Sequence, residues 1–507
     1  MTLNGDNVSD YYLRIEGVNL SNFIEDTYDL STIRGGALTL LKSIEKIERL
    51  LGELNAADVK KITSSASIGL FRFRAEDRSI STIKEAVNQC LMPGDDTLPS
   101  RHVTFVVDIT KFDTDFKRTQ TKVTVLNRFN QFKQLTIIIP EKNACRIGSY
   151  CDLDYIRPGR TEVFKGDEKF ICSDSVVARR DFGKNQKKSF YYDLMNRFGL
   201  EVELLYDFVD TFEELSTGYK DQVLDRKMCV IYLDGNHFGQ IRKTCDSDTQ
   251  LTDFSQDIER KRASFLAEVF NRFNHDPRFI STENTYRIEI LRWGGDEVTL
   301  VVPACLGWEV LSLFYDFSAE WTSIVGRAGL RHAGGMVFCH HKAPIHRVVR
   351  LAETLASNAK AADRARNIFQ YEVLESFDHI GNDILAYRKT RIPFDLPKPE
   401  KETGPWIKLF SLSGQDMQSI QKFFHQIREQ LPKNKIYQVL YQPGSPDTAE
   451  HDKALESVTK RIKKLYGPEV FRLLESLSAY FHGHIPLTFY HLYALWDYLP
   501  EAKRNEA

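Results

Sequence analysis

The chain has 507 residues, a net charge of −2 and 42% hydrophobic residues. That length predicts about three domains, and the nearly balanced charge excludes a global positive field able to hold long nucleic acid. No segment has the length and hydrophobicity of a signal peptide or a membrane span, so we expect a cytoplasmic protein that does not contact a membrane.

The amino-terminal segment predicts a strand, a helix, a hairpin and a second strand, in that order. Residues 12–20 form the first predicted strand, and residues 33–38 open a helix of about thirteen residues. Residues 66–73 occupy the hairpin position without any carboxylate, and residues 102–109 form a further apolar strand.

A basic run follows at residues 179–188, with aromatic residues directly after it at 190–192. Basic residues beside aromatic ones can bind phosphates and stack bases. A solvated surface loop is the preferred interpretation of this run, and a contact with RNA or a triphosphate stays open as the alternative.

Three cysteines, Cys145, Cys151 and Cys172, lie in the same region. They lack the paired Cys-x-x-Cys spacing of a zinc ribbon, and neither a fourth ligand nor a nearby histidine is evident. We therefore expect a degenerate ribbon without zinc.

A buried strand that ends in a carboxylate is predicted near the middle of the chain. Residues 228–233 form an uninterrupted apolar run, as in a central strand. The run ends at Asp234 and Gly235, which offer a carboxylate and a backbone carbonyl side by side. Residues 255–273 then carry apolar residues at helical spacing.

The second acidic element is Gly294-Gly295-Asp296-Glu297, which lies between two strand-like runs. The glycines favour a tight hairpin, and adjacent carboxylates at its tip favour a bound hard cation. A solvated turn is the alternative, because turns are rich in Gly and Asp, but Asp234 favours the metal interpretation. Strand, Asp, helix, strand, hairpin and strand is the order found in the palm of two-metal nucleotidyl transferases.

These motifs resemble two related families. Residues 232–238 (Tyr-Leu-Asp-Gly-Asn-His-Phe) are similar to the first metal motif of GGDEF-type cyclases, and residues 294–298 to their signature loop. Residues 333–345, with the helix at 351–360, resemble a narrower family, the large polymerase-like subunit of type III CRISPR effector complexes. In that family, the palm makes cyclic oligoadenylates.

The resemblance implies a site that holds Mg²⁺ (or Mn²⁺) and a nucleotide. Asp234, Asp296 and Glu297 are the implied catalytic carboxylates, and they bind the metal together with Gly235. The implied nucleotide-binding residues are Gly235, Asn236, Phe238, Gly294, Gly295, Lys360 and Arg364, of which Lys360 and Arg364 match the family's phosphate-binding basic pair.

Two positions depart from the related families. Residues 241–243 (Ile-Arg-Lys) lack the Asn-Asp pair that reads guanine in guanylate-specific members, which favours adenine. Glu297 stands where the CRISPR subunits usually have a second Asp, and its longer side chain can still bind Mg²⁺.

The predicted fold class is α+β, with two ferredoxin-like palms followed by a helical domain. We expect an eroded palm at 1–140, which positions nucleotide, and an inter-palm region at 141–220. A catalytic palm at 221–390 and a carboxy-terminal helical domain at 391–507 complete the chain. The eroded palm is the feature that narrows the resemblance to the CRISPR family.

The expected function is synthesis of cyclic or short oligoadenylate messengers from ATP in antiviral defence. Expected partners are guide or target RNA and other effector subunits, or further copies of the chain if it is free-standing. Two alternatives stay open: a catalytically silent palm scaffold that binds RNA, and a diguanylate cyclase.

Overall fold

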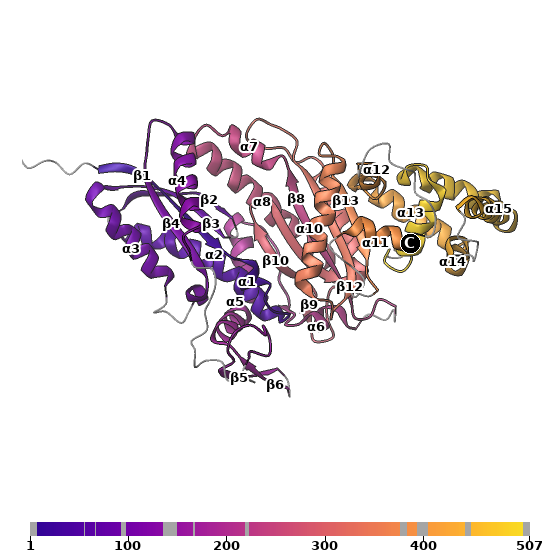
Figure 1. Ribbon diagram of the computed structural model, residues 1–507, viewed down its shortest axis with the longest axis horizontal. Coiled ribbons are helices and arrows are strands. Elements are labelled where there is room, and N and C mark those ends of the chain that lie inside the picture. The colour runs from indigo at the N-terminus through magenta and orange to yellow at the C-terminus, as the bar shows by residue number, and fades with distance from the viewer. Residues whose placement is uncertain are drawn as a thin grey trace, which may run out of the picture.

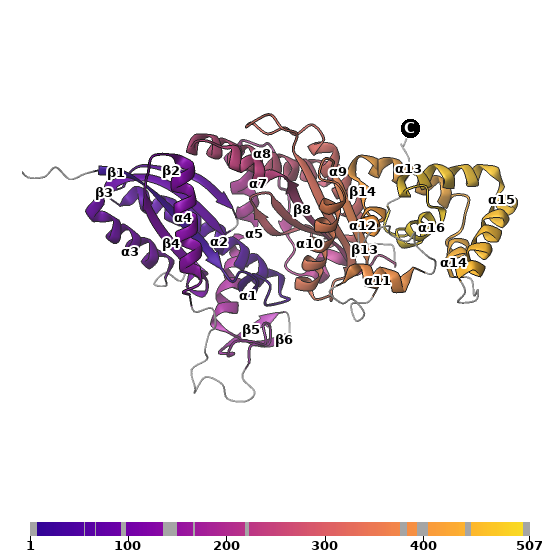
Figure 2. The same cartoon turned by 45° about the horizontal axis from the view of Figure 1, so that its top comes forward.

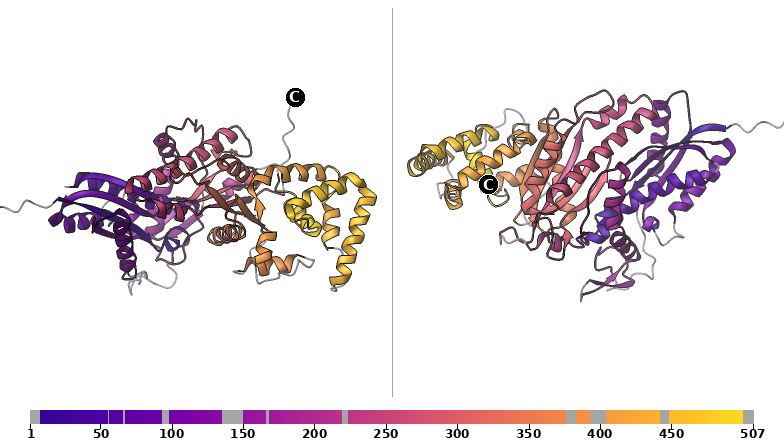
Figure 3. Two further views of the ribbon diagram at one scale, coloured as in Figure 1. Left: turned by 90° about the horizontal axis from the view of Figure 1, so that it is seen from above. Right: turned by 180° about the vertical axis from the view of Figure 1, so that it is seen from behind.

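The computed structural model describes residues 8–54, 56–65, 67–92, 98–134, 150–165, 168–218, 223–375, 383–392, 404–441 and 448–499. Three units follow one another along the long axis: an amino-terminal palm, a second palm and a helical domain (Figure 1). The same linear arrangement is visible from above and from behind (Figure 3).

The first palm is a four-stranded antiparallel sheet with the strand order β2-β3-β1-β4. Helices α2 and α3 cover one face of the sheet, and α4 covers the other. Its elements are β1 (Val8–Val18), α1 (Ser21–Ile24), α2 (Leu30–Glu53), β2 (Ala57–Ser65), β3 (Ile68–Glu76), α3 (Ile80–Leu91), β4 (Thr104–Lys111) and α4 (Phe116–Gln131).

Helix α2 is longer than the sequence predicted. It has 24 residues and begins at Leu30, where the carboxylate of Asp29 accepts a hydrogen bond from the Thr32 amide as an N-cap. The estimate of about thirteen residues was wrong because the buried stripe continues through Ile47 and Leu51. Nothing in that stretch interrupts the helical periodicity.

The second palm is built on a six-stranded sheet with the order β10-β11-β8-β12-β13-β14, in which β14 (Leu412–Ser413) comes from the carboxy-terminal unit. Helices α8 and α9 pack against one face of β8, and α10 packs against the other. Its elements are β8 (Lys227–Asn236), α7 (Phe238–Thr244), α8 (Asp248–Phe273), β9 (Thr285–Tyr286), β10 (Glu289–Gly294), β11 (Glu297–Pro303), α9 (Ala304–Ser318), β12 (Arg331–His340), α10 (Ile345–Ala362), β13 (Ile368–Val373) and α11 (Ile384–Arg391).

The two palms share one topology. In each, the first strand lies between the second strand of a hairpin and a later antiparallel strand, so β2-β3-β1-β4 corresponds to β10-β11-β8-β12. The amide of Gly17 donates to the Ser67 carbonyl at 2.8 Å, as that of Gly235 does to Asp296 at 3.2 Å. This register sets Glu16 against Asp234 as the equivalent strand-end acid.

A long helix between the palms corrects the interpretation of the basic run. Residues 179–188 lie within α5 (Asp174–Phe198) rather than in a solvated loop. Arg179 is fully buried and donates to both carboxylate oxygens of Asp26, at 2.8 and 3.0 Å. The sequence pattern failed here because the acid that neutralises the arginine lies far away in the chain, in the first palm.

Helix α5 crosses α2 at a point where only glycine fits. A Cβ atom on Gly183 would lie 2.0 Å from the Ser31 carbonyl oxygen, and one on Gly35 would lie 1.7 Å from the Arg179 carbonyl oxygen. The close crossing anchors α5 to the first palm. The remaining inter-palm elements are β5 (Thr161–Lys165), β6 (Glu168–Cys172), β7 (Asp207–Phe208) and α6 (Phe212–Ser216).

The hairpin of β5 and β6 projects away from both sheets (Figure 2). Cys151 and Cys172 are buried in this small unit, and burial followed by the neighbouring Cys151 thiol raises the pKa of Cys172 to about 12. Cys145 lies outside the described residues, so the expected degenerate zinc ribbon stays a prediction.

A buried ion pair joins the two palms. The Nε atom of Arg34 on α2 donates to both carboxylate oxygens of Glu289 on β10, at 3.0 and 3.1 Å. Both side chains are at most 3% exposed, and the Arg34 Nη2 atom also donates to the Val209 carbonyl at 2.7 Å. The pair fixes α2 against the edge strand of the second sheet.

The carboxy-terminal unit is helical apart from β14, which adds to the second palm's sheet beside β13. Its longest helix, α15, is kinked at Gly467-Pro468. None of the helices in the described ranges is long and apolar enough to cross a membrane. The elements of the carboxy-terminal unit are α12 (Gly404–Leu409), β14 (Leu412–Ser413), α13 (Met417–Arg428), α14 (Lys433–Tyr441), α15 (Thr448–Ser478) and α16 (Ile485–Ala494).

Together, these units confirm the predicted fold class: two ferredoxin-like palms and a helical domain. The short parallel pairing of β7 with β9 ties the inter-palm region to the second palm. Strands from the two sides of each expected boundary therefore pair with each other: β7 with β9 across residue 220, and β13 with β14 across residue 391.

Candidate active site

The first acidic group of the site lies at the end of the buried strand β8. Residues 228–233 are each at most 6% exposed, whereas the Asp234 side chain is 24% exposed. A Cβ atom on Gly235 would lie 2.6 Å from the Phe238 ring, so glycine is required where the strand turns into α7. The strand therefore brings a carboxylate and a carbonyl to one edge of the sheet.

The Gly-Gly-Asp-Glu segment forms the predicted hairpin. Gly294 pairs with Glu297, which leaves Gly295 and Asp296 as a two-residue loop. Gly295 has a φ of +55°, the conformation that the first loop residue of a type II′ hairpin adopts. Glu297 lies directly opposite Asp234 on the neighbouring strand, so the structure brings the three predicted carboxylate residues to one edge.

Lys360, in the last turn of α10, binds the strand-end oxygens. Its Nζ atom donates to Asp234 Oδ2 at 2.6 Å and to the Gly235 carbonyl at 2.8 Å. Burial raises the pKa of Asp234, the Lys360 ammonium lowers it, and the charges of Asp296 and Glu297 raise it again. The net direction is upward, because the carboxyl is desolvated and lies beside two like charges.

The donors at this edge fit a hard divalent cation in kind. Asp234 and Gly235 already share one positive charge, the Lys360 ammonium, and carboxylate and carbonyl oxygens are the ligands that Mg²⁺ prefers. Among the described residues, however, no group of three or more Asp, Glu, His or Cys side chains is arranged to hold a metal ion. A metal ion at these two oxygens would compete with the Lys360 ammonium for them.

A cavity of about 480 Å³ lies between the palms beside the hairpin. Ser65, Ser67 and Ile68 of the first palm's hairpin line it, as do residues 294–297 of the second palm's hairpin. A Cβ atom on Gly295 would lie 3.5 Å from Cβ of Ser65, so the two hairpin tips lie close to each other. Asp234 and Lys360 are not among the residues that line it.

The remaining predicted nucleotide-binding residues lie around the strand end. The Asn236 side chain is buried, and its amide donates to the carbonyls of Arg364 at 3.2 Å and Arg366 at 3.4 Å. Phe238 is 2% exposed, with its ring against Gly235. In this state, both side chains support the strand end from within the protein, and the Arg364 side chain is exposed.

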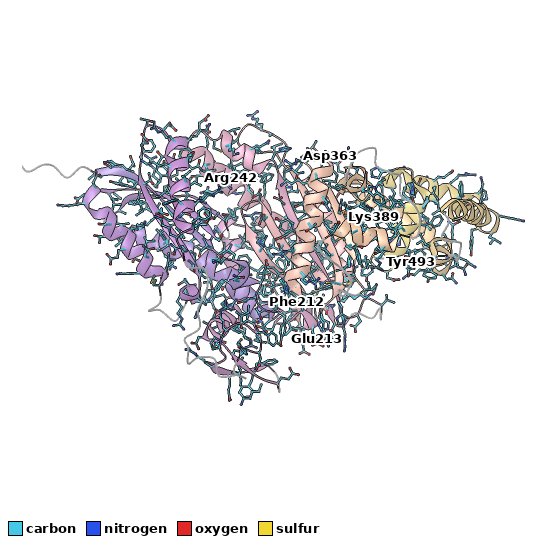
Figure 4. All side chains as sticks on the ribbon, in the orientation of Figure 1. Phe212, Glu213, Arg242, Asp363, Lys389 and Tyr493 are labelled. Atoms are coloured by element: carbon cyan, nitrogen blue, oxygen red, sulfur yellow. The ribbon has the colours of Figure 1, made fainter. Side chains whose placement is uncertain are left out.

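The sequence interpretation missed several charged residues that line the cavity. Arg292 and Glu353 line it beside the hairpin, and Glu25 reaches it from the first palm. Arg242, considered only as a departure from the guanine-reading pair, also lines the cavity, and Figure 4 shows it near the boundary between the palms. The available signal for Arg292 was its place among apolar residues directly before the hairpin glycines.

The fold and the acidic hairpin define the second unit as a nucleotide-cyclase-related palm. Residues 227–369 match the family model of the second palm domain of Cas10/Cmr2. This segment therefore belongs to the large-subunit family of type III CRISPR complexes, which confirms the predicted resemblance over those residues.

Several solved structures are similar over most of the chain. A Csm1–Csm4 cassette in complex with pppApA is 12% identical, with 95% of this chain and 69% of that chain covered and a TM-score of 0.48. The cassette in complex with cA4 is 14% identical, with 95% of this chain and 70% of that chain covered and a TM-score of 0.42. Csm1 of T. onnurineus is 13% identical, with 96% of this chain and 71% of that chain covered and a TM-score of 0.42. No curated protein matches the sequence.

Proposed function

We propose that the chain is a Mg²⁺-dependent nucleotidyltransferase that joins ATP into cyclic or short linear oligoadenylates, as the large subunit of a type III-like CRISPR effector. One observation carries the proposal. Asp296 and Glu297 line a cavity that both palms form, and the strand-end carboxylate Asp234 lies directly opposite Glu297 on the neighbouring strand. A nucleotide in that cavity would have its phosphates beside the hairpin acids, with Asp234 one strand away.

The residues have separate tasks in this proposal. Asp234, Asp296 and Glu297, with the Gly235 carbonyl, would hold Mg²⁺, which supplies activation of a ribose hydroxyl and neutralises the leaving pyrophosphate. Lys360 keeps the Asp234 carboxylate paired until the site is loaded, and then becomes available to a phosphate. Gly295 carries no side chain, so a donor nucleotide can lie against the hairpin backbone.

The partners of the acids favour a second candidate, a catalytically silent scaffold that binds RNA in an effector complex. Asp234 is paired with Lys360 at 2.6 Å, and Glu297 with Arg292 at 3.2 Å. A palm that had lost turnover could keep such internal ion pairs permanently. A diguanylate cyclase is a third candidate, and the choice of nucleotide separates it from the first.

Mass spectrometry of the products separates these candidates. The purified protein is incubated with labelled ATP or GTP and Mg²⁺, with and without guide and target RNA. Oligoadenylates support the proposal, cyclic diguanylate supports the third candidate, and no product under any condition supports the scaffold.

A double variant tests the acidic hairpin. Asp296→Ala with Glu297→Ala is expected to abolish product formation, whereas Glu320→Gln, an exposed acid after α9, is the matched control and keeps it. Persistent product in the double variant would show that the assigned carboxylates do not carry the reaction.

A further inference from the structure

Arg292 on β10 contacts three carboxylates at the hairpin end of the cavity. Its Nη1 atom lies 2.7 Å from Glu353 Oε1 on α10 and 3.2 Å from Glu297 Oε2. Its Nη2 atom lies 3.3 Å from Oε1 of Glu25, in the first palm. The guanidinium therefore links the acidic hairpin, α10 and the first palm.

The charges in this cluster do not balance. All four side chains are partly buried, from 26% exposed for Glu25 to 43% for Glu297. Arg350 also lines the cavity, and its charge acts on Glu25. Two cations thus face three carboxylates, so each acid competes for Arg292 and no acid holds it alone.

The cluster also determines where the Glu297 carboxylate lies. The Glu297 backbone pairs directly with Asp234, at the edge where a cation would bind. Its carboxylate, however, is bonded to Arg292, which is on the opposite side of β11 from β8. Glutamate has one methylene more than aspartate, and this extra reach lets one side chain serve either partner.

We propose that Arg292 is a positioning residue that holds Glu297 in a resting cluster with Glu353 and Glu25, and releases it toward Asp234 when a divalent cation binds. This inference rests on the proposed function, because Glu297 has a second partner beside Asp234 only if the site binds a divalent cation. Glu25 and Glu353 set the strength of the Arg292–Glu297 interaction, because both compete with Glu297 for the same guanidinium. A first-palm residue thereby takes part in forming the metal site.

A double-mutant cycle on cation affinity tests the proposal. The dissociation constant of Mn²⁺ is measured by electron paramagnetic resonance on the full chain, without nucleotide. Glu297→Gln is made in the native protein and in Arg292→Met. In the native protein, where Glu297 must first leave Arg292, the expected weakening is less than about twofold. In Arg292→Met, where Glu297 is already free, the expected weakening is about tenfold.

The control is Arg242→Met, which removes a cation from the same cavity but not from the cluster around Arg292. Glu297→Gln in that background is expected to have its native effect. Arg292→Lys, which keeps the charge but not the fork of donors, is expected to give an intermediate coupling. It also provides a folded protein if Arg292→Met fails to fold. Equal effects of Glu297→Gln in every background would overturn the proposal.

The same measurements separate this inference from the proposed function. Mn²⁺ binding that is lost in Asp234→Asn, combined with additive effects of Arg292 and Glu297, overturns the positioning role alone. If neither the native protein nor any variant binds Mn²⁺, both the positioning role and the metal-dependent function are overturned.

Discussion

The contact between Lys360 and Asp234 gives the most direct test of the site. Lys360 donates to two of the oxygens of the proposed metal site, Oδ2 of Asp234 and the Gly235 carbonyl. Replacing Lys360 by Met removes this internal competitor. We therefore expect Lys360→Met to bind Mg²⁺ more tightly than the native protein in the absence of nucleotide, and to bind the ATP triphosphate more weakly.

The magnitude follows from the two hydrogen bonds that are lost. A hydrogen bond to a charged group contributes about 1.5–3 kcal/mol. The two side chains are 21% and 24% exposed, so solvent screening reduces the net value of the contact to about 1–2 kcal/mol. Because about 1.4 kcal/mol corresponds to a factor of ten, nucleotide-free Mg²⁺ affinity should rise by about tenfold.

Isothermal titration calorimetry with Mg²⁺ alone, and then with ATP, checks both directions. Lys243→Met, at an exposed lysine on α7, is the matched control and should change neither affinity strongly. An unchanged or weaker Mg²⁺ affinity in Lys360→Met would refute the competition between ammonium and metal. An unchanged ATP affinity would refute the phosphate contact.

Three further predictions concern stability. Burial lowers the pKa of His332 to about 3, whereas the value in the unfolded chain is near 6.5. Between these values, His332 takes up a proton only when the chain unfolds, so the free energy of unfolding should fall as the pH falls. Urea unfolding should show a decrease of about 2–3 kcal/mol in this free energy between pH 6.5 and 4.5, and His332→Phe should not show it. Gly183→Ala places a methyl group against a backbone carbonyl of α2, so it should lower the free energy of unfolding, measured by thermal unfolding, by about 3 kcal/mol or more. Gly52→Ala, where nothing lies within 4 Å of the new Cβ, should instead stabilise by up to about 1 kcal/mol. Glu289→Gln should lower the free energy of unfolding by about 3–5 kcal/mol, because the buried Arg34 guanidinium then keeps only Asp210, at 3.8 Å, as a charged partner. Replacing both Arg34 and Glu289 by Met should lower it much less, and equal losses would contradict the inter-palm pair.

The second palm could be predicted largely because its signals are local. The apolar run at 228–233 marks a buried strand, and two glycines before two acids mark a hairpin. Each signal lies within a few residues, and β-sheet geometry does the rest by placing Glu297 opposite Asp234. The pairing of two acidic elements therefore follows from local pattern and strand order.

The contacts of the site's cations could not be predicted in the same way. Lys360 lies 126 residues from Asp234, and Arg292 lies 267 residues from Glu25. A sequence pattern does not specify which acid a basic residue meets across such separations. The resemblance assigns Lys360 to phosphate binding, which stays a prediction, and its contact with Asp234 depends on how α10 packs over β8.

The closeness of the two hairpins gives a physical reason for the asymmetry of the duplicated palms. The first palm keeps the hairpin, the glycine after the strand-end acid, and Glu16 at the position of Asp234. Its hairpin nevertheless carries Ser65 and Ser67, whose side chains line the same cavity as Asp296. A second acidic pair at that tip would add like charges in a partly desolvated space, where each carboxylate raises the cost of ionising the others. Small neutral side chains let the tips lie close together and leave room for a ligand, so the second palm's hairpin acids face the shared cavity without like charges from the first palm's hairpin.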